Sequence, residues 1–155
     1  MWTRTWTWTA ARFWMQVLPG AVTFFAGLVL LMIWIMEYDS DFQSAAATRL
    51  PVPVISAHAL LALGGLTLWL TYILADQERL AWVSVAVLGT VAVLGLVMAA
   101  RWVRVYRTFA SPGPSLTRKS TVPPERNFPV PVVVAHGVLG VTTLVLVLLT
   151  ILGGT

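Results

Sequence analysis

Four long apolar runs divide this sequence, and they constrain its fold more than any other feature. They extend over residues 17–36, 51–75, 80–100 and 129–152. A helix of about 20 residues crosses a hydrocarbon core of about 30 Å. Only 10% of the residues are charged, whereas soluble domains average about 25%, so lipid must solvate most of the surface. The sequence therefore predicts an all-α, integral membrane four-helix bundle.

Residues 1–16 form a distinct segment before the first apolar run. They carry four tryptophans among threonine and arginine residues: Trp2, Trp6, Trp8 and Trp14. Tryptophan prefers the membrane–water interface, where its ring is half buried and its N–H is wet. We expect an interfacial Trp-rich tail along the membrane surface, with a partner-docking arm as the alternative. The apolar run that follows is longer than the apolar core of a usual signal peptide, so we expect a retained helix.

An internal duplication is the most informative pattern in the chain. Residues 51–74 and 129–152 align without gaps, with 12 of 24 positions identical. Both copies contain Pro-Val-Pro-Val-x-x-Ala-His. Leucine and valine matches are common between membrane helices, but two prolines and a histidine in register are not. The preceding helices match more faintly, through two sets of residues that align in order: Gly27, Trp34 and Tyr38 with Gly95, Trp102 and Tyr106.

The duplication predicts two tandem helical-hairpin repeats, residues 17–79 and 80–155. The second repeat carries a basic, Pro-rich loop at 101–128. Each repeat contains two spans, so both have the same orientation, and a pseudo-two-fold axis along the membrane normal should relate them. The turn at 76–79 is very short, so the second and third helices should be antiparallel neighbours.

His58 and His136 are the only histidines, and they occupy equivalent positions in the two copies. Each lies seven residues after the first proline of its run, or ~10 Å along a helix axis. Both are therefore expected inside the hydrocarbon at one depth. An ionisable group there is a functional candidate by default. The simpler interpretation is that each histidine only hydrogen-bonds to a neighbouring helix.

The residue types near the histidines favour a porphyrin over a bare metal ion. Cysteine is absent, and the six acidic residues all lie in loops or at span ends, so a four-ligand metal site is not expected. A porphyrin supplies four nitrogens itself, and His58 and His136 could be the axial ligands of its iron. Small side chains one and two turns further would let a flat macrocycle lie against the helices, although ordinary helix packing uses the same residues: Ala62, Gly65, Gly140 and Thr143.

Four helices with paired histidines resemble the membrane-anchor cytochromes b, in which histidines from two helices hold one b-type haem. This resemblance implies a haem-bearing subunit that relays electrons within a membrane redox complex. Two alternatives remain open. One is a cofactor-free accessory subunit of a larger respiratory or photosynthetic complex, and the other is a pigment-binding subunit in which each histidine ligates its own chlorin.

The expected partners follow from the same features. The lipid bilayer is one, and other membrane subunits or a second copy of this chain are others, because a small chain with Trp-rich and Pro-rich appendages suits an assembly. Quinone binding is possible, and nucleic-acid binding is not expected. No Ser-His-Asp set, phosphate loop or buried carboxylate pair appears in the sequence, so an electron-transfer or accessory role is favoured over that of a stand-alone enzyme.

The distribution of basic residues predicts the topology. The 38–50 and 101–128 regions hold seven of the ten, and short loops rich in Lys and Arg stay in the cytoplasm: Arg49, Arg101, Arg104, Arg107, Arg118, Lys119 and Arg126. Some of these could instead pair with haem propionates. We expect a bacterial inner (plasma) membrane protein with both loops cytoplasmic and both termini outside. A C-terminal reporter fusion should report an external location, and a cytoplasmic signal would contradict this topology.

Overall fold

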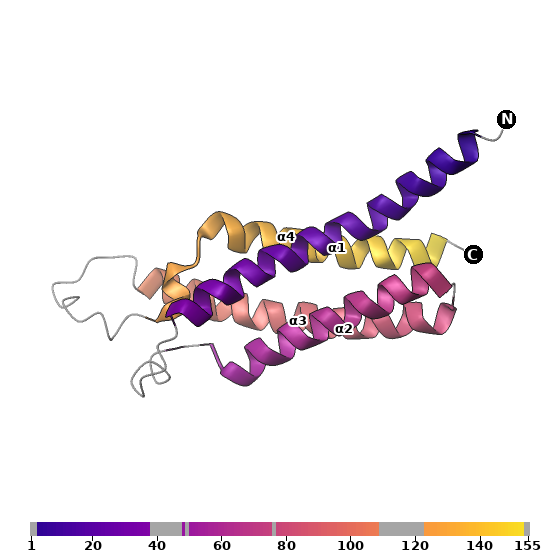
Figure 1. Cartoon of the computed structure of the whole chain (residues 1–155). Coiled ribbons are helices and arrows are strands. Elements are labelled where there is room, and N and C mark those ends of the chain that lie inside the picture. Colours follow the sequence, from indigo (N-terminus) through magenta and orange to yellow (C-terminus); the bar gives the residue numbers. More distant parts are fainter. Residues whose placement is uncertain (1–2, 38–47, 49, 76, 109–122, 154–155) are drawn as a thin grey trace.

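The computed structural model describes residues 3–37, 48, 50–75, 77–108 and 123–153. Its elements are α1 (Thr3–Glu37), α2 (Val52–Ala75), α3 (Glu78–Thr108), the short 3-10 helix η2 (Pro124–Asn127) and α4 (Val130–Gly153) (Figure 1). No strand occurs in these ranges. All four long helices contain a segment long and apolar enough to cross a membrane. For the described residues, the prediction of an all-helical chain with four helices able to span a membrane is confirmed.

The two ends of the bundle differ in the chain segments they hold. The start of α1, the end of α4 and the turn between α2 and α3 lie at one end, here called the terminal end (Figure 1). The end of α1, the start of α2, the end of α3 and η2 lie at the opposite end, here called the loop end, as does the start of α4. Both Pro-Val-Pro segments therefore open their helices at the loop end.

The helices α2 and α4 begin in the same way because the same residues start them. The carbonyl oxygen of Pro51 accepts hydrogen bonds from the backbone N–H groups of Val54 and Ile55, at 2.9 and 3.2 Å. The carbonyl oxygen of Pro129 accepts the equivalent bonds at 3.0 and 3.1 Å. Proline suits a helix start because the N–H that it lacks would have no partner there.

The closest helix pairs are α2 with α3 and α1 with α4 (Figure 1). The pairing of α2 and α3 was predicted, because only two residues separate Ala75 from Glu78. The predicted hairpin of α1 and α2 is much looser. A long segment, residues 38–51, joins these two helices, so the connection does not force them together. Each helix of the first predicted repeat thus packs mainly on a helix of the second.

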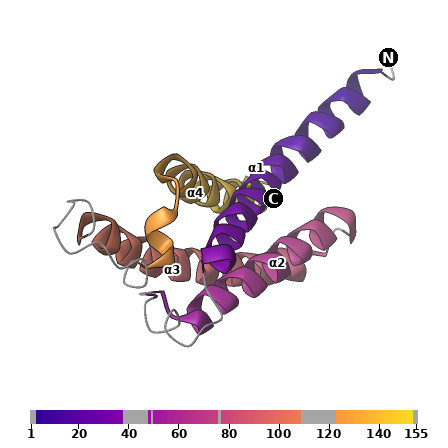
Figure 2. The same ribbon diagram turned by 60° about the vertical axis from the view of Figure 1, so that its left-hand side comes forward.

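The Trp-rich tail is largely helical. Helix α1 begins at Thr3 and runs without a break through Pro19. The Thr23 hydroxyl donates to the Pro19 carbonyl oxygen at 2.7 Å. The N-terminal part of α1 projects beyond the other helices in both views (Figure 2). Residues 3–16 therefore continue the first spanning helix, and their placement along the membrane surface stays a prediction.

Two groups of buried apolar side chains hold the bundle together. The first comprises Trp69, Ala81, Leu88, Val147 and Ile151. The second lies at the loop end and comprises Trp34, Leu50 and Ile55. Large apolar side chains are also exposed on the surface, and Phe25 and Leu74 are 66% and 74% exposed. Such a surface is suited to lipid and would aggregate in water.

Adjacent glycines on α2 provide a test of this packing. A Cβ atom on Gly65 would lie 2.8 Å from Leu88 Cδ2 and 3.2 Å from Val87 Cγ1, whereas one on Gly64 would meet nothing within 4 Å. We expect Gly65→Ala to destabilise the bundle by about 1–3 kcal/mol through overpacking. Gly64→Ala should be neutral or stabilise by up to ~1 kcal/mol, through helix propensity. Thermal unfolding in mild detergent measures both, and equal effects would contradict the packing of α2 on α3.

Candidate cofactor site

A cavity of about 440 Å³ lies among the four long helices. Both histidines line it, and apolar side chains form most of the remaining wall. Residues of the loop-end apolar group, such as Trp34 and Ile55, line one part of it, and Leu88 and Leu144 line another. The space between the buried groups is therefore the region that contains His58 and His136.

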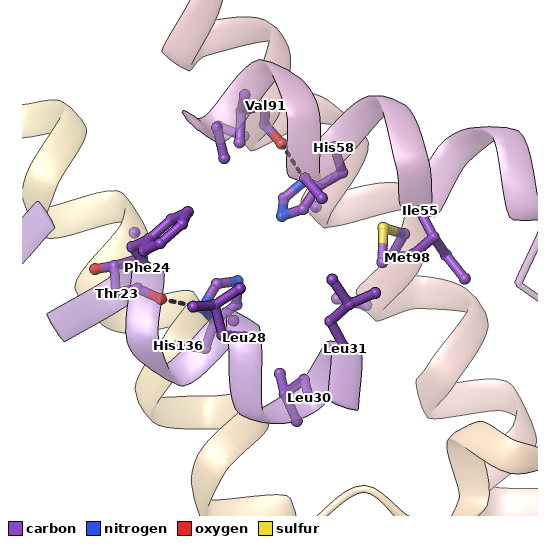
Figure 3. Close-up of a pocket in the computed structure, with 18 of the residues that line it drawn as sticks. Thr23, Phe24, Leu28, Leu30, Leu31, Ile55, His58, Val91, Met98 and His136 are labelled. Atoms are coloured by element: carbon purple, nitrogen blue, oxygen red, sulfur yellow. Dashed lines mark hydrogen bonds between the residues drawn. The ribbon is translucent and has the colours of Figure 1, made fainter. Parts of the chain in front are cut away.

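Each histidine is oriented by a backbone carbonyl on a neighbouring helix (Figure 3). His58 Nδ1 on α2 lies 3.1 Å from the Val91 carbonyl oxygen on α3. His136 Nδ1 on α4 lies 2.9 Å from the Thr23 carbonyl oxygen on α1. A carbonyl oxygen can only accept, so each Nδ1 must carry the proton. In the neutral ring, each Nε2 is then left with a free lone pair.

Glycines on the same two helices let the rings lie close to the backbone. A Cβ atom on Gly27 would be 2.9 Å from His136 Cε1, and one on Gly95 would be 3.2 Å from His58 Cε1. Gly27 is one helical turn beyond Thr23, and Gly95 is one turn beyond Val91, so each glycine and carbonyl share a helix face. Glycine at these two positions therefore makes room for the hydrogen-bonded imidazoles.

The two imidazoles face one another across the cavity (Figure 3). Their ring centroids are 6.1 Å apart, and the ring planes are inclined by 67°. Among the described residues, the only hydrogen bonds of these rings are those made by Nδ1. The sequence predicted that His58 and His136 approach one another from two helices, and the structure brings their rings to this separation. Their common depth in a membrane stays a prediction.

The other predicted site residues divide into two groups. Ala62, Gly140 and Thr143 line the cavity with the histidines. Gly65 is absent from the lining and instead lies against Leu88 of α3. The i+7 spacing from His58 placed Gly65 on the correct helical face, but that part of the face is covered by helix packing.

The contacts of the two histidines correspond across the predicted repeats. His136 follows His58 by 78 residues, and Val91 and Gly95 follow Thr23 and Gly27 by 68. The ten-residue difference is the extra length of the second loop. Sequence reasoning missed the carbonyl partners and the role of the two glycines. The alignment of Gly27 with Gly95 was the signal that could have identified them.

A short hydrogen-bond network joins the chain segments at the loop end. The indole N–H of Trp34 donates to the Thr48 hydroxyl at 3.4 Å, and that hydroxyl donates to Glu125 Oε2 at 3.1 Å. Glu125 is fully buried in η2. The network therefore anchors η2 and the segment before α2 to α1, beside the cavity wall that Trp34 forms.

Within the described ranges, no group of three or more His, Cys, Asp or Glu residues could hold a metal ion. His58 and His136 are the titratable side chains among the residues that line the cavity. The chain matches no protein-family profile, no curated protein and no solved structure.

Glycine substitutions test the seating of the histidines. We expect Gly27→Ala to push the His136 ring away and cost about 1–3 kcal/mol of stability. Gly95→Ala should also destabilise the protein, but by less. Its Cβ would lie 3.2 Å from His58 Cε1, whereas a Cβ on Gly27 would lie 2.9 Å from His136 Cε1. Gly89→Ala is the control on α3, where an added Cβ meets nothing within 4 Å. The measurement is thermal unfolding in detergent. Equal melting temperatures for Gly27→Ala and Gly89→Ala would contradict the close contact between Gly27 and His136.

Proposed function

We propose that this chain is a membrane b-type cytochrome, or a haem-bearing subunit, that relays electrons within a membrane redox complex. His58 and His136 would be the two axial ligands of one haem b. When bound, the haem would supply reversible one-electron oxidation and reduction of its iron. The single observation that carries this proposal is the pair of imidazoles that face each other in an apolar cavity with both Nε2 lone pairs free.

The hydrogen bonds of the histidines support a ligand role. Metal-binding histidines usually donate their second ring N–H to a carbonyl or carboxylate, which fixes the tautomer and the ring orientation. The Nδ1 bonds to Val91 and Thr23 are of this kind. A packing role explains these bonds equally well. It does not explain why two further nitrogen lone pairs are directed into an apolar space, which is costly without a partner.

The dimensions of the site also fit one haem. Two axial nitrogens at about 2 Å from a metal place the imidazole centroids roughly 6 Å apart, and the observed separation is 6.1 Å. The cavity volume of about 440 Å³ falls within the ~300–1,000 Å³ of typical cofactor sites. These values favour one shared macrocycle.

The pigment alternative fits the spacing less well. Two chlorins, one on each histidine, would put two stacked macrocycles between the rings. Stacked planes need about 3.5 Å between them, and each metal–nitrogen bond adds about 2 Å. The ring centroids would then lie well beyond the observed 6.1 Å. The cofactor-free accessory role is the remaining alternative, and the Nδ1 hydrogen bonds between helices are the observation in its favour.

The tandem-repeat arrangement belongs to the same proposal. A pseudo-two-fold axis along the membrane normal would exchange His58 with His136, Val91 with Thr23 and Gly95 with Gly27. The matched contacts of the two histidines support it. Each histidine would then be held by a helix of the other repeat, so the site requires both repeats.

The chemistry expected of the residues is limited to holding and insulating the cofactor. Two histidine ligands would leave no open position for O₂ or substrate on the iron. The apolar wall would exclude water from the macrocycle. Electrons would therefore enter and leave through partners in the bilayer, such as other subunits, a second copy of this chain or a quinone. We place the chain in a bacterial inner membrane with the loop end cytoplasmic.

Replacement of either ligand provides the test. The purified chain should show a Soret band with reduced α and β bands of six-coordinate, low-spin haem. His58→Ala or His136→Ala should abolish this species, because only one protein ligand would remain. Both variants should still insert, since each span keeps its apolar length. Thr142→Ala is the control, because its exposed hydroxyl bonds only to Val138 of its own helix.

The proposal would be rejected by either of two results. One is a haem-free wild-type chain expressed with ample haem. The other is a low-spin spectrum that survives the loss of either histidine.

A further inference from the structure

Two tryptophans form part of the cavity wall at the loop end. Trp34 follows Gly27 by seven residues, and Trp102 follows Gly95 by seven. Seven residues are about two turns, or ~10 Å along the axis on the same helix face. Both side chains line the cavity, and they are only 7% and 8% exposed. Each tryptophan therefore lies closer to the loop end than the glycine on its helix that contacts a histidine ring.

The two indole N–H groups differ in their partners. Trp34 donates to the Thr48 hydroxyl at 3.4 Å. The Nε1 atom of Trp102 is buried, and no acceptor for it occurs in the part of the chain that the structure describes. A buried indole N–H normally has an acceptor, because leaving it without one costs free energy. An acceptor on a molecule in the cavity would supply what is missing.

Trp69 shows why the cavity matters to this argument. Its Nε1 atom is also buried without an acceptor among the described residues. Trp69, however, is packed among Ala81, Leu88, Val147 and Ile151 and does not line the cavity. Nothing could bind beside it without displacing that packing. Of the two buried indole N–H groups without an acceptor among the described residues, that of Trp102 is the one beside space for a ligand.

The charge distribution identifies the kind of acceptor. Arginines on the last turns of α3 and in η2 lie at the loop end, at positions 101, 104, 107 and 126. Apart from the two histidines, the residues that line the cavity carry no ionisable group. Glu37 and Glu125 are the acidic residues of the described loop end, so the four arginines leave it positive. An anionic acceptor in the cavity is therefore stabilised most at this end, where the Trp102 N–H donor also lies.

We propose that the indole N–H of Trp102 donates a hydrogen bond to a propionate carboxylate of the bound haem, so that the propionate edge faces the loop end. This inference rests on the proposed haem site and deepens it by assigning the orientation of the macrocycle. Trp102 acts as a positioning residue, because it holds the edge of the cofactor and not its iron.

The test compares Trp102→Phe with Trp69→Phe in the haem-loaded protein. Loss of a donor to the carboxylate leaves more negative charge beside the iron and favours the ferric state. We expect Trp102→Phe to lower the midpoint potential by ~30 mV, about a threefold change in the ferrous-to-ferric ratio. Haem loss to a scavenger should also become about threefold faster. Trp69→Phe removes an equally buried N–H outside the cavity and should change neither quantity.

Haem dimethyl ester identifies the acceptor. Its propionates are neutral, so the difference between wild type and Trp102→Phe should largely disappear with this cofactor. A difference that persists at full size would show that the effect does not depend on a propionate charge, and would overturn the inference. If Trp102→Phe does not fold, benzothienylalanine at this position keeps the ring shape and removes only the N–H.

The outcomes separate this inference from the function itself. A wild-type chain that binds no haem rejects the proposed function. A wild-type chain that binds haem, with Trp102→Phe and Trp69→Phe identical in potential and haem loss, rejects only the role of Trp102.

Discussion

The hydrogen bond from each imidazole to a backbone carbonyl of a neighbouring helix is the interaction on which the site depends. A helix carbonyl is normally shielded by the side chains around it, and a ring can approach only where a glycine leaves the helix surface open. Gly27 and Gly95 provide this opening one turn beyond Thr23 and Val91. The hydrogen bond then fixes the orientation of the ring and its tautomer, which leaves the free lone pair on Nε2 of a ring that lines the cavity.

The same contacts explain how the four helices are arranged. His58 joins α2 to α3, and His136 joins α4 to α1, and these are the two closest helix pairs. Apolar burial contributes little specificity in a membrane, because lipid tails are as apolar as leucine. Polar contacts and close glycine packing, such as Gly65 against Leu88, therefore have a large part in selecting the pairs.

Much of the architecture could be predicted from sequence, because membrane spans and a repeated Pro-Val-Pro-Val-x-x-Ala-His motif are local signals. The cavity position of Ala62, Gly140 and Thr143 also follows from helical spacing. Apart from the pairing of α2 with α3, which their short turn predicts, the choice of neighbouring helices does not follow, because the same apolar residues suit any neighbour. For that reason the structure was needed to find the carbonyl partners of the histidines and the close approach of their rings to Gly27 and Gly95. It was also needed to find the loose α1–α2 hairpin and the covered position of Gly65.

The central claim is that one iron is held by one histidine from each repeat. Pulsed electron paramagnetic resonance on the ferric protein, with ¹⁵N-labelled histidine as the only label, tests it most directly. The account predicts one low-spin haem per chain, with hyperfine coupling from two axial histidine nitrogens. Coupling from a single histidine, or from none, would contradict the shared site between His58 and His136.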